Sequence, residues 1–524
     1  MTTLTGTDVE WTAPGRGQWE RDEAHQAAPF CGYMADFFGH HFNPGFVAAF
    51  ARYGVLLDHF EVAAVRGWLY FRPRPVGAPD KPGSGLPPKP VFKALFALHP
   101  GLRSRRKAAT AAVSARRWYE DAARWDHEGR EGFRRRLRAL QAVDPTGLDE
   151  AALATHLAQA HDLLADGFRQ HFAGAVAHYI GVGDWAIKAC EWTGATPAEA
   201  IAALRGSSPA SIATVAPIDR VAGAVRQAPG ASAILDEEGD PAGRLVRLRA
   251  SSPAVDAALT DYLDEHGWRI ATGFDVADRT TIELPHAVLA SIHARLTSGP
   301  PATAAAGADM LRPRVPAQHQ AEYDELLAVA TTLYGLRDDD VGLCYQWPMG
   351  LLRRALLAVG SRLAARGVID EAVHIIDATR PEVDALLGVA RGPAPAAGEL
   401  AARADDRRRV AAQPAPPVRL GDDEGGPPPS SWLPPAVARV NDALLFAMGL
   451  DANALAATTE APSAPTTGAD SIHGHPASAG TYRGRARLVL GPADFEKLAQ
   501  GDVLVAPLTS PTYNVVLPLL GAVV

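Results

Sequence analysis

Apolar residues recur with the period of an α-helix over most of this 524-residue chain. The pattern is clearest in three segments, which are Pro44 to Tyr53, Leu148 to Ile180 and Met349 to Arg366. In the last segment, the apolar residues that share one face are Leu352, Leu356, Val359 and Leu363. Gly367 follows directly and supplies a common helix stop. The pattern predicts a body that is mainly α-helical.

Shorter segments follow the pattern of β-strands. Phe60 to Val65 and Trp68 to Phe71 flank Gly67, and this arrangement predicts a hairpin. Near the C-terminus, Ala486 to Leu490 and Val503 to Ala506 are short apolar runs of the kind found in buried strands. The sequence therefore predicts a mainly α body with a small β-hairpin, followed by a small α/β segment.

Proline, glycine and alanine are concentrated in stretches that divide the chain. Gly392 to Ser431 and Thr458 to Asp470 are too polar and too broken to bury a core, so we expect both to be mobile tethers. We predict four regions, which are an N-terminal region with a helix and the hairpin (1–90), a helical body (91–391), a linker with one helix (392–471) and a small α/β domain (472–524).

Charge and composition exclude several functions. The net charge of −8 argues against nucleic acid as a partner. Arg103 to Arg138 contains eleven Arg and one Lys, but five acids interrupt it, so we interpret it as a charged helix surface. The N-terminus has no signal-peptide pattern, and no apolar run is long enough to span a membrane. We expect a cytoplasmic protein without a membrane partner.

Candidate metal and catalytic residues are sparse. The three cysteines, Cys31, Cys190 and Cys344, lie too far apart for a disulfide or metal framework. The histidines between Leu148 and Ile180 lack the i, i+4 spacing that would place two imidazoles on one helical face. The sequence also lacks a P-loop and the common hydrolase motifs. We expect no metal site and no cofactor site in this chain.

The segment from Gly474 to Val524 carries a series of short motifs. Their residues are Ser478, Gly480, Gly484, Arg487, Gly501, Asp502, Thr509, Ser510 and Pro511. In this order and spacing, the motifs resemble the mobile phosphohistidine domain of the phosphoenolpyruvate-utilising enzymes. That family includes phosphoenolpyruvate synthase and rifampicin phosphotransferase. The resemblance implies a swivelling α/β domain of the phosphohistidine type.

The resemblance also implies that this mobile domain is incomplete in the chain. In the family, a paired glycine and then Ser-His follow the strand that begins here at Gly521, and the histidine carries the phosphate. This sequence ends at Val524. We therefore expect a truncated domain whose carrier histidine lies beyond Val524, and we assign no catalytic residue within the chain.

Two further stretches resemble the same family. The run H-G-W-R…G-F-D…I-E-L-P, from His266 to Pro285, is similar to its helical middle region, and Arg353 to Asp370 is similar to the helix before the mobile domain. Candidate substrate-binding residues in these stretches are Arg269, Asp275, Glu283, Arg353 and Arg354. The alternative is structural, since such side chains also tie loops together or lie exposed on helices.

The resemblance implies a component of a phosphotransferase that passes phosphate through a mobile histidine domain to a small-molecule acceptor. The helical body would hold the acceptor in a mostly apolar pocket. ATP or phosphoenolpyruvate, with Mg²⁺, would bind to a separate partner chain, because this sequence shows no segment resembling the donor-binding domains of the family. The alternative is a non-catalytic binding or interaction protein derived from that family.

Overall fold

The computed structural model describes residues 11–23, 25–78, 86–204, 209–298, 310–422, 426–459, 480–489, 492–506, 513 and 516–524. Helices dominate it, and the described strands form two small sheets, so the prediction of a mainly α protein is confirmed. The chain divides into two compact units. Unit 1 comprises Met1–Ala177, Phe274–Ala277 and Leu343–Asp442, and unit 2 comprises His178–Gly273, Asp278–Gly342 and Ala443–Val524.

Unit 1 contains a four-stranded sheet with the order β2-β3-β1-β4. Its strands are β1 (Trp19–Arg21), β2 (Leu57–Val65), β3 (Trp68–Pro75) and β4 (Arg419–Leu420). The predicted hairpin is β2–β3, in which Val65 pairs with Trp68. Arg66 and Gly67 form the two-residue turn, and both have positive φ angles, 52° and 82°. Such a turn matches the twist of the strands, which explains the glycine.

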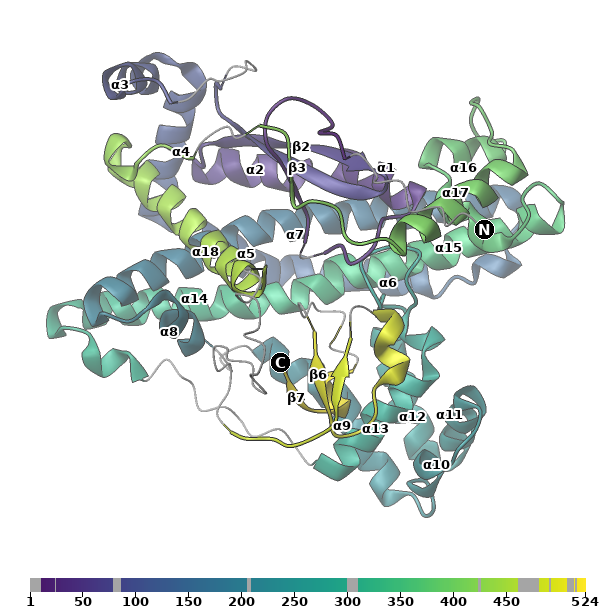
Figure 1. Cartoon of the computed structure of the whole chain (residues 1–524). Helices are drawn as coiled ribbons and strands as arrows, with labels where there is room; N and C mark the ends of the chain where they lie inside the picture. The colour runs from purple at the N-terminus through teal and green to yellow at the C-terminus, as the bar shows by residue number, and fades with distance from the viewer. Residues whose placement is uncertain are drawn as a thin grey trace, which may run out of the picture. The chain divides into compact units, whose positions relative to one another are not determined.

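Two helices of unit 1, α1 (Gly32–His41) and α2 (Asn43–Tyr53), pack against β2 of this sheet (Figure 1). The other helices of unit 1 are α3 (Lys89–Leu98), α4 (Pro100–Ala115), α5 (Arg117–Arg124), α6 (Arg130–Gln141), the first part of α7 (Glu150–Thr193), α15 (Trp347–Ala365), α16 (Arg380–Leu386) and α17 (Ala397–Ala411). A 3-10 helix, η8 (Ala372–Asp377), packs on α15. Phe168 lies at the centre of an aromatic core, with ring centroids 5.0 Å from Phe37, 5.1 Å from Phe38 and 4.6 Å from Tyr345.

Two elements differ from the sequence prediction. α7 (Glu150–Thr193) continues past Ile180, because the buried Val182 and Trp185 offset the low helix propensity of its glycines. α17 lies within Gly392–Ser431, which the sequence predicted to be a mobile tether that buries no core. Charged residues dominate its sequence, so no apolar stripe predicts a helix that packs on a core. In the structure, Leu400, Ala404 and Val410 are nevertheless buried.

Unit 2 is built mainly from helices that pack on two apolar cores. They are α8 (Pro197–Ala203), α9 (Pro209–Gln227), α10 (Ala233–Asp236), α11 (Pro241–Ala250), α12 (Pro253–His266), α13 (Pro285–Ser298) and α14 (Gln320–Asp340). The last long helix, α18 (Pro435–Thr459), begins in unit 1. One core lies among α9, α11, α12 and α13 and includes Val225, Leu248 and Ile292. The other includes Trp185 and Tyr323.

The C-terminal part of unit 2 forms a three-stranded parallel sheet with the order β5-β6-β7. Its strands are β5 (Ala486–Leu488), β6 (Asp502–Val505) and β7 (Leu520–Val523), so the strands predicted at these places are confirmed. Val489, Phe495, Leu504, Tyr513 and Val516 form a small apolar core beside the sheet. β6 alternates between buried and partly exposed side chains, whereas the sequence predicted a strand buried throughout.

Candidate ligand-binding site

Four of the described motif residues, Gly484, Arg487, Gly501 and Asp502, meet at the start of β6. Arg487 Nε donates to Asp502 Oδ2 at 3.1 Å, and the Ala499 N–H donates to the same oxygen at 2.9 Å. The hydrogen bond from Ala499, followed by that from Arg487, lowers the pKa of the buried Asp502 carboxyl. Arg487 and Asp502 thus join β5 to β6.

The glycines of this segment allow the backbone to approach closely. A Cβ on Gly484 would lie 2.6 Å from the Gly501 carbonyl oxygen, and Gly501 has a φ of 82°. Gly480 is exposed and has a φ of 129°. The other motif residues, Ser478 and Thr509 to Pro511, lie outside the described residues.

Asp275 and Arg353 hold one short segment of unit 1 in place. Asp275 accepts hydrogen bonds from the Cys31 N–H at 2.6 Å, from Cys31 Sγ at 2.8 Å and from the Ala277 N–H at 2.9 Å. Arg353 Nη1 donates to the Val276 carbonyl at 2.8 Å. Burial raises the pKa of the Asp275 carboxyl, although these hydrogen bonds act against it, and burial also raises the pKa of the Cys31 thiol.

The remaining candidates are also engaged with the protein itself. In unit 2, Arg269 Nε donates to the Glu265 carbonyl at 3.0 Å, and Glu283 accepts from the Thr280 N–H at 2.8 Å in a capping box. In unit 1, Arg354 Nη1 donates to the Gln141 carbonyl at 2.9 Å. These contacts agree with the structural alternative, in which the side chains tie loops and helix ends together.

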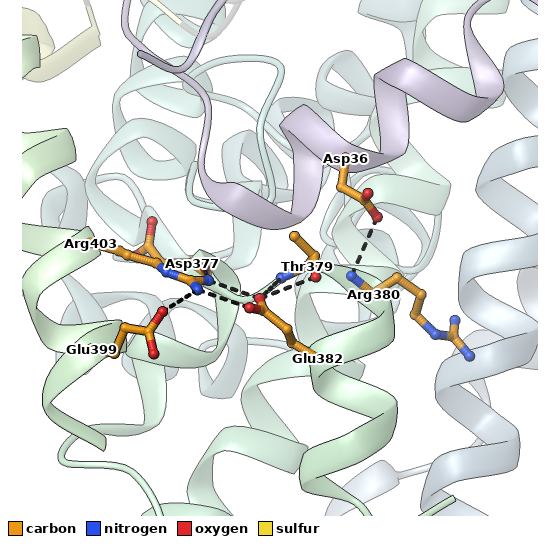
Figure 2. A network of polar contacts seen from close by, with 7 residues as sticks. All are labelled: Asp36, Asp377, Thr379, Arg380, Glu382, Glu399 and Arg403. Carbon is orange, nitrogen blue, oxygen red and sulfur yellow. Dashed lines mark hydrogen bonds and ion pairs between the residues drawn. The ribbon is translucent and has the colours of Figure 1, made fainter. Parts of the chain in front are cut away.

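A second polar cluster of unit 1 joins η8, α16 and α17 (Figure 2). Arg403 donates to both carboxylate oxygens of Glu382 at 2.8 Å and to Glu399 at 2.6 Å. Glu382 also accepts from the Thr379 N–H at 2.8 Å, which completes the capping box of α16. The hydrogen bond from Arg403 contributes most to lowering the pKa of Glu382 to about 2. Charges paired in this way serve the fold rather than a ligand.

Unit 2 contains a pocket of about 310 Å³. This volume lies at the lower end of the range for small-molecule sites. Its walls come from α10, α11, α13, the loop at Thr272 and Arg279, and the C-terminal segment. Apolar lining residues include Leu235, Leu284, Ala290, Phe495, Leu498 and Val516. The polar lining residues are Arg244, Thr272, Arg279, His286, His293 and Gln500.

Local hydrogen bonds position several of these polar groups. Arg244 donates from Nε to the Ile234 carbonyl at 3.2 Å and from Nη2 to the Leu235 carbonyl at 2.6 Å, so the end of α10 holds its guanidinium. His293 Nε2 lies 3.1 Å from Asp236 Oδ1. Thr272 Oγ1 accepts from the Arg279 N–H at 2.9 Å.

The pocket combines an apolar surface with cations. Arg244 and Arg279 line it, and no Asp or Glu is among its lining residues. Guanidinium groups bind carboxylate and phosphate oxygens, while the apolar wall suits the carbon skeleton of a ligand. The arrangement therefore fits a small amphipathic molecule with an anionic group or one that receives such a group.

Sequence reasoning did not find this pocket. Its lining residues run from Leu235 to Leu519, and no local motif connects them. One signal was present, since His286 and His293 are seven residues apart and share a face of α13. Arg279 also lies inside the stretch from His266 to Pro285 that was singled out for other residues.

The described residues form a mainly helical protein with a pocket beside the small parallel sheet of unit 2. The family model described as "Rifampicin phosphotransferase fourth domain" matches residues 171–356. This match supports the interpretation of the chain as a member of the phosphoenolpyruvate-utilising enzyme family. No curated protein matched the chain. Among the described residues, no helix is long and apolar enough to cross a membrane, and no group of three or more His, Cys, Asp or Glu could hold a metal ion.

Proposed function

We propose that this chain is the acceptor-binding component of a phosphotransferase of the phosphoenolpyruvate-utilising type. The supporting observation is the composition of the pocket wall. One side comes from α10, α11, α13 and the loop at Thr272 and Arg279, within the matched residues 171–356, and the other comes from residues 495–519 of the segment that resembles a phosphohistidine domain. A ligand in this pocket would contact both parts.

The proposed reaction transfers a phosphoryl group from a histidine to a hydroxyl or similar group of the bound acceptor. A histidine carrier splits the transfer between donor and acceptor into two displacements. Arg244 and Arg279 would balance the charge of the phosphoryl oxygens, and the apolar wall would keep water from the acceptor. These residues bind and orient, and none of them is the nucleophile.

The carrier histidine and the donor site are assigned to other residues. None of the C-terminal motif residues is a histidine, so the proposal places the carrier outside residues 1–524, in a swivelling domain whose first part is the segment from about residue 472. A partner chain would bind ATP or phosphoenolpyruvate with Mg²⁺.

A substitution that fills the pocket tests the binding step. Ala290→Trp places an indole in the pocket, whereas Ala242→Trp places the same group at an exposed position of α11 that does not line it. The probe is anilinonaphthalene sulfonate, whose anionic and apolar parts match the pocket. We expect the wild type and Ala242→Trp to bind it equally and Ala290→Trp to lose the binding. Equal binding by all three proteins would contradict the assignment of the pocket.

A second pair of variants tests the role of charge. Arg279→Gln removes a lining cation, and Arg247→Gln removes an exposed cation that pairs with Glu237 and does not line the pocket. The first substitution should weaken binding of the probe by roughly tenfold, the worth of one charge-assisted contact, and the second should leave it unchanged.

A further inference from the structure

A second surface lies far along the chain from the pocket residues, on the hairpin of α3 and α4 in unit 1. From Leu86 to Tyr119 the sequence contains eight Lys and Arg residues and no Asp or Glu. Five of these cations are exposed, namely Lys89, Lys93, Arg103, Arg106 and Lys107. Among the residues that the structure describes, no acidic side chain pairs with any of the five.

A later helix of unit 1, α6, carries arginines that are paired. Arg130 pairs with Asp126 at 2.9 Å, and Arg134 pairs with Glu131 at 3.1 Å. Arg136 pairs with Asp166 at 2.5 Å. The five exposed cations of α3 and α4 thus lack an acidic partner among the described residues, whereas Arg130, Arg134 and Arg136 of α6 are paired.

The same hairpin exposes an apolar stripe. Val91, Leu95 and Leu98 follow at i, i+4 and i+7 on α3, with exposed fractions of 49%, 43% and 74%. Leu86 just before the helix is 44% exposed. The core-facing side of α3 is a separate one, where Phe92 and Phe96 are buried and the Phe92 ring lies 5.8 Å from that of Trp432. The stripe is thus additional to the packing of α3.

A helical hairpin that exposes both aliphatic side chains and unpaired cations matches an anionic lipid surface. Helices that lie in the membrane interface insert aliphatic residues between the headgroups while Lys and Arg attract anionic lipids. Nucleic acid would use the cations and leave the stripe of Val91, Leu95 and Leu98 in water. A second copy of this chain would bring two cationic surfaces together through the same face. The lipid surface is the partner that uses both features.

We infer that the α3–α4 hairpin docks this protein onto anionic membrane surfaces. The sequence led us to expect no membrane partner because it contains no spanning segment, but docking of this kind needs none. Since every residue involved lies outside the pocket, the inference is independent of the proposed function.

Co-sedimentation with lipid vesicles tests the inference on the full chain. We expect binding to vesicles of equal parts phosphatidylcholine and phosphatidylglycerol, and none to phosphatidylcholine alone. Raising the salt to about 1 M should release the protein, because the screening length falls to about 3 Å. Equal binding to both vesicles, or binding to neither, would overturn the inference.

Matched variants separate the two features of the surface. R106Q/K107Q should weaken binding roughly 25-fold, at about fivefold for each cation, whereas R408Q/R409Q on α17 should not. Leu98→Glu should weaken it about tenfold or more, whereas Val246→Glu, at a 66% exposed site on α11, should not.

The assignment would be refuted if R408Q/R409Q weakened vesicle binding as much as R106Q/K107Q, or if Val246→Glu weakened it as much as Leu98→Glu. Light scattering adds an independent check. A wild-type dimer that Leu98→Glu converts to a monomer would show that a second copy covers the stripe, and it would likewise overturn the inference.

Discussion

Glu382 offers a quantitative test of how unit 1 is held together. Both of its carboxylate oxygens accept from Arg403 at 2.8 Å, and it also accepts from the N–H and hydroxyl of Thr379 at 2.8 and 3.1 Å (Figure 2). Glu382→Gln keeps one amide oxygen for the cap but removes the charge and the bidentate pairing with Arg403. Glu399→Gln is the matched control, because Glu399 is more exposed and contacts the same arginine through one hydrogen bond.

The magnitude follows from the pKa. A fall from the ordinary value of 4.5 to about 2 corresponds to at most about 3.4 kcal/mol of stabilisation by the ionised group. Solvent screening of this partly exposed pair reduces the expectation to roughly 1–2 kcal/mol for Glu382→Gln at neutral pH. The control should lose less than about 0.5 kcal/mol.

The pH dependence has a defined sign. Because the pKa of Glu382 is lower in the folded protein than in the unfolded chain, its stabilisation is fully present above about pH 4.5 and is lost as the pH falls towards 2. The difference between wild type and Glu382→Gln should therefore shrink over that range.

Hydrogen exchange of peptides from α16 and α17, converted to opening free energies, measures this difference locally, which is preferable in a chain with two units. A larger loss in Glu399→Gln than in Glu382→Gln, or a Glu382→Gln loss that does not change with pH, would refute the reasoning.

Two further predictions concern packing. Gly167→Ala should destabilise unit 1 by several kcal/mol, because the added Cβ would lie 2.1 Å from the Cys344 carbonyl oxygen. The control Gly39→Ala on α1 meets nothing within 4 Å and should be neutral or stabilising by about 0.5–1 kcal/mol. Urea unfolding of the two variants measures the difference. Asp502→Asn removes the charged partner of Arg487 and should speed hydrogen exchange in β5 and β6, and unchanged exchange would argue against its structural role.

Local patterns predicted much of the fold. Phe46, Ala49, Phe50 and Tyr53 recur with helical spacing. In α2, the last three of these side chains are buried, as the spacing predicts. The β2–β3 hairpin follows from a glycine that can adopt a positive φ between two apolar runs. These elements could be predicted from the sequence because the residues that determine them lie within a few positions of one another.

The rest depends on distant partners. α17 was missed because its positioning relies on ion pairs of Arg403 and Arg407 with Glu382 and Asp377, residues of earlier segments. The pocket was missed because α11, α13 and the C-terminal segment each contribute a few side chains. Asp275 was singled out by resemblance, yet its oxygens bind Cys31, which is 244 positions away. Sequence spacing carries no information about such contacts.

Phosphoryl transfer to a ligand of the pocket tests the central claim most directly. A phosphohistidine domain, labelled with radioactive phosphate from phosphoenolpyruvate, is mixed with the chain and a fraction of small metabolites. The account predicts an acid-stable labelled small molecule that forms with the wild type and with Ala242→Trp but not with Ala290→Trp. If metabolites bind to the wild type but no label is transferred, the chain is a non-catalytic binding protein and the account is wrong. Label transfer by Ala290→Trp at the wild-type rate would equally contradict it, because the acceptor would then bind outside the pocket.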